Sequence, residues 1–76
     1  MTKAQKALLE GLVAGLELVE QRAFGHYATL GYKHVHMGTF KSAKRRGWIV
    51  DNSSDPYVMA RFHTITAAGR AALEEV

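Results

Sequence analysis

The chain has 76 residues, with 10 Lys and Arg against 7 Asp and Glu and a net charge of +3, so we expect one small, mildly basic domain. It contains no cysteine, which excludes disulfides and thiolate metal sites and suits a reducing cytoplasm. No apolar stretch is long enough for a membrane helix and the first residues lack the pattern of a signal peptide, so we expect a cytoplasmic protein with no membrane partner.

The first predicted element is a helix that begins after Thr2. Gln5 follows Thr2 at the spacing of a capping box. One apolar face of this helix is predicted by residues at helical spacing: Leu8, Leu9, Leu12 and Val13. Gly15 favours an end there. An alternative helix continues to about Ala23, but the two glycines at 11 and 15 disfavour it.

The next segment favours short strands. Residues 16–22 and 26–30 predict an additional hairpin, joined around Phe24 and Gly25. Residues 31–38 are either a connector or a short helix.

A short basic helix is predicted over residues 39–46, with Gly47 as its stop. Its core side is expected to carry Met37, Phe40 and Ala43. The opposite, solvent side is expected to carry Lys41, Ser42 and Arg45, with Thr39 and Arg46 flanking and Lys44 nearer the apolar edge. Residues 33–46 contain basic side chains and no acid, which is the charge segregation of an electrostatic binding surface.

Residues 48–50 begin a strand, residues 51–56 have turn chemistry, and residues 57–65 predict the return strand. Thr66 then caps a last helix over residues 67–75. Three apolar residues of this region are expected to be largely buried: Trp48, Ile49 and Ile65. The predicted fold class is α+β, in which a helix, a two-stranded wing and a closing helix form a winged helix-turn-helix.

A family resemblance supports this fold. Thr39 through Ile49, followed by Ile65 through Leu73, resembles small bacterial and phage winged-helix proteins. Their recognition helix ends in Arg-Gly-Leu/Trp-Ile and their wing in Leu-Thr-x-x-Gly-Arg, an ending best known from MarR-type regulators. The resemblance covers most of the chain and is weakest over residues 16–36. It implies a single winged-helix domain, residues 1–76, that binds double-stranded DNA and regulates transcription in bacteria or phage.

The resemblance also implies a set of nucleic-acid-binding residues. Those facing the major groove or its phosphates would be Lys41, Ser42, Arg45 and Arg46. Those positioning the DNA backbone would be Lys33, His34 and Lys44, with Thr39 capping the helix at a phosphate and Arg61 supporting the wing. The chain departs from the family at Ala43, where a large leucine is usual, and in a wing that carries Asp51 and Asp55 instead of basic residues.

Other function classes have less support. The residues provide no Ser/His/Asp order, no carboxylate pair in a cleft and no glycine-rich phosphate loop, so we expect no catalysis and no cofactor. We expect no metal site either, because the histidines have no acid or cysteine beside them at ligand spacing. The alternative is a protein-interaction module, such as a phage-encoded inhibitor of a host protein, which the acidic wing favours. The sequence leaves open whether the chain forms a homodimer.

Overall fold

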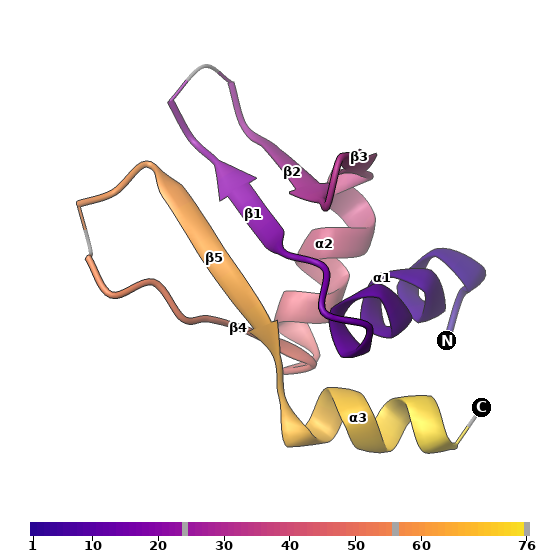
Figure 1. Ribbon diagram of the computed structural model, residues 1–76. Coiled ribbons are helices and arrows are strands. Elements are labelled where there is room, and N and C mark those ends of the chain that lie inside the picture. Colours follow the sequence, from indigo (N-terminus) through magenta and orange to yellow (C-terminus); the bar gives the residue numbers. More distant parts are fainter. Residues whose placement is uncertain (24, 56, 76) are drawn as a thin grey trace.

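The computed structural model describes residues 1–23, 25–55 and 57–75, and within these ranges the chain forms three helices and a five-stranded antiparallel sheet (Figure 1). The elements in chain order are α1 (Lys3–Val13), β1 (Leu18–Gln21), β2 (Tyr27–Leu30), β3 (Lys33–Val35), α2 (Met37–Arg45), β4 (Ile49–Asp51), β5 (Ala60–Ile65) and α3 (Ala67–Glu74). The predicted α+β class is confirmed. Phe24 and Pro56, which fall in predicted turns, lie outside the described residues. None of the described helices has the length and apolar character needed to cross a membrane.

Both ends of α1 form as predicted. The Thr2 hydroxyl accepts a hydrogen bond from the Gln5 backbone N–H (3.1 Å), and the Gln5 side chain accepts one from the Thr2 N–H (2.8 Å). The helix stops before Gly15, whose φ of 96° lies in the left-handed region that favours glycine. The longer alternative to Ala23 is wrong, because residues 18–21 form β1 instead.

The sheet has the strand order β3-β2-β1-β5-β4. The predicted first hairpin is confirmed as the β1–β2 pair, in which Leu18 lies opposite Leu30. The strand predicted from residue 48 and its return strand are confirmed as the β4–β5 pair, with Ile49 opposite Ile65. The return strand is shorter than predicted, because β5 begins at Ala60 and not at residue 57. The segment expected to be a connector or short helix instead contains an edge strand, β3, which pairs with β2.

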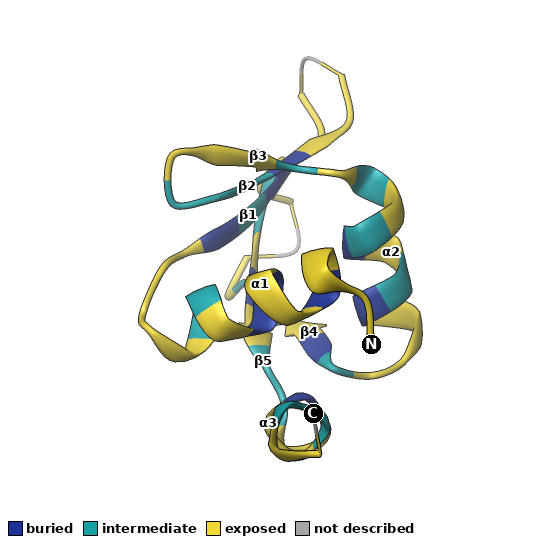
Figure 2. Ribbon diagram, turned by 90° about the vertical axis from the view of Figure 1, so that its right-hand side faces the viewer, coloured by how far each residue is buried: buried dark blue, intermediate teal, exposed yellow. Residues whose placement is uncertain are grey.

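Helices α1 and α2 lie against one face of the sheet; in Figure 2, α1 passes in front of the strands and α2 lies to their right. The core lies between these layers and consists of Leu8, Leu9, Leu18, Ala28, Phe40, Ala43 and Ile49. Ile49 is buried as predicted, whereas Trp48 and Ile65 are only half-buried and pack at the edge of this core. The other face of the sheet has no helix over it in the described part of the chain (Figure 1). That face leaves Phe62 44% exposed and Tyr27 37% exposed.

Helix α3 is fixed to the sheet at its first turn. Thr66 is its N-cap as predicted, and its hydroxyl accepts from the Gly69 N–H (3.0 Å). The Thr66 N–H donates to the Trp48 carbonyl (2.9 Å), and the Cα of Gly69 faces that same carbonyl with no room for a side chain. The Thr-x-x-Gly order at residues 66–69 therefore has a local structural explanation: threonine starts the helix and glycine allows close approach to the backbone ahead of β4.

Candidate nucleic-acid interface

The candidate interface is built on α2. The helix begins two residues earlier than predicted, because the N-cap is His36, whose Nδ1 accepts from the Gly38 N–H (3.2 Å). It is anchored on the core by Phe40 and Ala43, which are 1% and 0% exposed. It ends at Arg45, and the chain turns at Gly47 with φ 76°. Basic residues in the last turn are favoured by the partial negative charge of a helix C-terminus.

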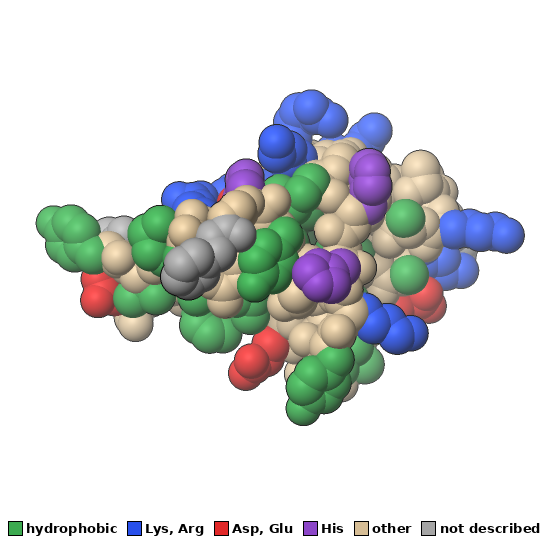
Figure 3. Space-filling view, turned by 90° about the horizontal axis from the view of Figure 1, so that it is seen from above, with side chains coloured by type: hydrophobic (Ala, Val, Ile, Leu, Met, Phe, Trp, Pro, Cys, Tyr) green, Lys and Arg blue, Asp and Glu red, His purple; other side chains and the backbone are tan. Residues whose placement is uncertain are grey.

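Four basic side chains of this region are exposed: Lys41, Lys44, Arg45 and Arg46. None of the four forms an ion pair with an acidic residue among residues 1–23, 25–55 and 57–75. Figure 3 shows Lys and Arg side chains gathered along its upper edge, on the side where α2 lies in Figure 1. The helix therefore presents positive charge to solvent that forms no direct ion pair within these ranges, as a phosphate-binding surface requires.

Two of these cations also contact aromatic rings. The Lys44 ammonium lies 6.0 Å from the centre of the Phe40 ring, and the Arg46 guanidinium lies 5.2 Å from the Trp48 ring. Such contacts hold a cation over an apolar surface without neutralising it. Lys44 thus extends from the apolar edge of the helix to solvent, as predicted.

Two predicted positions on α2 are wrong. Ser42 is half-buried and its hydroxyl accepts from the Gln5 Nε2 (2.9 Å), so it faces α1 and not solvent. Thr39 does not cap the helix, because His36 does so one turn earlier; Thr39 is half-buried on the side toward α1. A polar residue that faces a second helix satisfies its hydrogen bonds there and is withdrawn from an external ligand.

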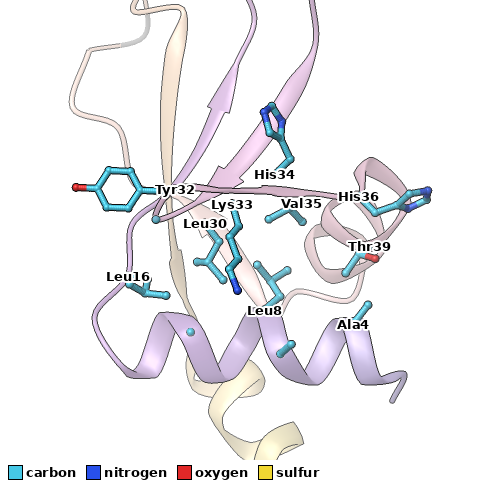
Figure 4. Close-up of a pocket in the computed structure, with 13 residues that line it drawn as sticks. Ala4, Leu8, Leu16, Leu30, Tyr32, Lys33, His34, Val35, His36 and Thr39 are labelled. Carbon is cyan, nitrogen blue, oxygen red and sulfur yellow. The ribbon is translucent and has the colours of Figure 1, made fainter.

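The remaining predicted site residues lie on other surfaces. Lys33 lines a groove beside α1 (Figure 4), and the His34 ring packs against Tyr27 with 5.3 Å between ring centres. The Arg61 Nε pairs with the Asp51 Oδ2 (2.8 Å), and its guanidinium also donates to the Asp55 carbonyl (2.6 Å). Arg61 therefore links β5 to the end of β4 and to the loop between them.

The contact with Arg61 also affects the ionisation of Asp51. Burial alone would raise the pKa of the Asp51 carboxyl, but hydrogen bonds from Ser53 and the Arg61 guanidinium outweigh burial and hold that pKa far below its usual range. Asp51 therefore stays ionised and its charge is compensated by Arg61, so this carboxylate repels an approaching phosphate less than a free one would.

A buried ionic cluster lies on the helix-covered face of the sheet, and sequence reasoning missed it. Glu20 is 2% exposed and accepts from Arg22 (3.0 Å) and from His26. His63, also 2% exposed, approaches Glu20 at 3.9 Å, and its Nε2 has no hydrogen-bond partner among the described residues. Burial opposes the charge on Glu20, yet its hydrogen bonds from His26 and Arg22 lower its pKa. Burial and the nearby Lys44 ammonium lower the pKa of His63, so its neutral form is favoured.

This cluster joins β1, β5 and the turn after β1. Within the described residues no three His, Cys, Asp or Glu side chains converge as metal ligands. The one sequence signal for it was the alternation of Leu18 and Glu20, which places the carboxylate on the same inward face as a core leucine.

No protein family, curated protein or solved structure was found to match this chain. The function is therefore inferred from the geometry of the chain itself.

Proposed function

We propose that this chain is a winged-helix domain that binds double-stranded DNA through α2, as a bacterial or phage transcriptional regulator or accessory factor. The observation that carries the proposal is the group of exposed basic residues on and after α2, namely Lys41, Lys44, Arg45 and Arg46, with no acidic partner in the described ranges. The order α2, β4, β5, α3 agrees with a recognition helix followed by a wing and a closing helix. The β2–β3 pair, placed directly before α2, would stand in for the helix that usually precedes a recognition helix.

The position of the charges favours contact with phosphates over contact with bases. Recognition helices of this class usually read bases with their N-terminal residues. The first turn of α2 carries Met37, Gly38 and Thr39, of which Met37 and Thr39 are half-buried, whereas the basic residues lie in its second half. We therefore expect binding that depends strongly on salt and weakly on sequence.

The test is a titration with duplex DNA of arbitrary sequence at two salt concentrations. Replacing Arg45 and Arg46 with alanine should weaken binding and lower the slope of log K against log salt by about 0.9 for each lost phosphate contact. The matched control replaces Lys3 and Arg70, which are also exposed but lie on α1 and α3, and so removes the same charge elsewhere.

The control variant should bind almost as wild type does, and both variants should melt like wild type because all four side chains are exposed. If the two variants lose affinity equally, net charge and not α2 governs binding. If wild type does not bind duplex DNA even at low salt, the proposal is wrong.

The second candidate function is a protein-interaction module, including an inhibitor of a host protein. The observation that favours it is the sheet face opposite the helices, where Phe62, Tyr27 and Val50 are 44%, 37% and 49% exposed. Exposed apolar side chains that share one face are typical of protein interfaces. Under this alternative, Phe62→Ser would abolish partner binding while the double arginine variant would leave it unchanged.

A further inference from the structure

An open groove of about 550 Å³ runs between α1 and the β2–β3 turn (Figure 4). Its floor is aliphatic and is formed by Leu8, Leu16 and Leu30. Leu16 is 48% exposed, although an aliphatic side chain of this size gains free energy when it is covered. The groove therefore has unburied apolar surface available to a ligand.

Small residues of α1 keep the groove open. Ala4, Ala7 and Gly11 line its helical wall, where larger side chains would fill it. A Cβ at Gly11 would lie 2.6 Å from the Cδ2 of Leu30, so Leu30 packs directly on the helix backbone at this position.

The charge at the groove has one sign. Lys33 extends from β3 toward the groove in Figure 4, and no Asp or Glu is among the residues that line it. Lys33 forms no ion pair with another residue of the described ranges. His36 and Thr39 are the residues that line the same groove at the α2 side. A cation above an aliphatic floor complements a ligand with an anionic head and an apolar body.

We propose that this groove binds a free straight-chain monocarboxylate, with the carboxylate against the Lys33 ammonium and the alkyl chain along Leu8, Leu16 and Leu30. An alkyl chain fits better than an aromatic body, because the floor is aliphatic and Tyr32 stands fully exposed at the rim. The site is separate from the exposed basic residues of α2, and the proposal does not depend on DNA binding.

The experiment follows backbone amide shifts of the intact chain during titration with octanoate, 1-octanol, octylammonium and acetate, each below its aggregation limit. Octanoate should shift amides of residues 30–36 and of the α1 residues beside them. Octanol should bind more weakly, and octylammonium more weakly still. Acetate should cause no shift there, because it has a carboxylate but no alkyl chain to contact the leucines. Equal binding of the ammonium and the carboxylate would contradict the charge assignment.

Two variants and one control distinguish the charged part of the site from its apolar part. Lys33→Gln should weaken octanoate by about two- to fivefold and leave octanol unchanged. Lys6→Gln, a change of the same charge at an exposed position of α1 outside the groove, should alter neither. Ala7→Leu, at an exposed position that lines the groove, should fold normally and block both ligands.

Several results would overturn the proposal. One is an absence of octanoate shifts in the groove residues of folded wild type. Another is an equal response of Lys33→Gln and Lys6→Gln. A third is binding to vesicles of anionic lipid without binding to monomeric octanoate, which would assign the surface to membranes instead of a free acid.

Discussion

Replacing Gly69 with alanine should destabilise the protein, although the same change in an ordinary helix stabilises it. In a helix interior, alanine is favoured over glycine by roughly 1 kcal/mol. At Gly69, however, the new Cβ would overlap the Trp48 carbonyl oxygen and would lie 2.8 Å from the Cγ1 of Ile65 and 3.2 Å from the Trp48 carbonyl carbon. Two of these three atoms are backbone, so α3 must move away from the sheet.

The expected loss of stability is the cost of overpacking at residue 69 minus the gain from placing alanine in a helix. Overpacking costs about 1–3 kcal/mol, and contact with backbone places this site near the upper limit. Subtracting the helix gain leaves a loss of about 2 kcal/mol, which lowers the melting temperature of a domain this size by about 8–16 °C. Thermal unfolding followed by far-UV circular dichroism measures this directly.

Gly11→Ala is the matched control, because Gly11 is also helical and also close to a neighbour. Its new Cβ would meet side-chain atoms alone, the Cδ2 and Cγ of Leu30 at 2.6 and 3.3 Å and the Cδ1 of Leu16 at 3.4 Å, and these flexible side chains can shift. We expect its stability to stay within about 1 kcal/mol of wild type. If Gly69→Ala melts at or above the temperature of Gly11→Ala, the close packing of α3 against Trp48 is wrong.

Two further predictions concern the core beneath α2. Phe40→Ala should lower the free energy of unfolding, measured by chemical denaturation, by about 3–5 kcal/mol, because Phe40 is buried and its ring packs edge-on against the His63 ring with 4.9 Å between ring centres. Lys41→Ala should change it by no more than about 0.5 kcal/mol. Equal losses for the two variants would mean that α2 is rotated about its axis. The pKa of His63 is lowered in the folded protein, so the unfolded chain binds a proton at this residue more readily. The contribution of His63 to stability is therefore complete above about pH 6.5 and falls as the pH drops below that value. His63→Phe should remove this part of the pH dependence, and parallel stability curves for wild type and variant between about pH 7 and pH 5 would refute the assignment.

Elements defined by neighbouring residues could be predicted from the sequence. The start of α1 depends on Thr2 and Gln5, and the start of α3 depends on Thr66, so each signal lies within one helical turn. The β4–β5 pair was predictable for the same reason, since turn residues separate two segments rich in β-branched and aromatic side chains.

Features that depend on distant partners could not be predicted. Strand β3 is short and mostly exposed, so its residues show no alternation, and it is a strand because β2 lies beside it. The helical spacing of α2 and the polarity of serine predicted that Ser42 faces solvent. Ser42 instead faces α1, where the Gln5 side chain donates a hydrogen bond to its hydroxyl. The burial of Glu20 is tolerated because of Arg22 and His26 nearby, and it faces His63 from a strand far along the chain.

The strand order has a consequence for the kinetics of folding. Strands β1, β2 and β3 follow one another in sequence and in space, and so do β4 and β5, so each group can form from local contacts. The central β1–β5 pair, in which Leu18 lies opposite His63, must close the long intervening loop before the sheet is complete. We expect the pairing of β1 with β5 to be the slow step of folding, because non-local pairing limits folding rates. Substitutions at the β1–β5 interface should therefore slow folding, whereas substitutions on the edge strand β3 should mainly speed unfolding.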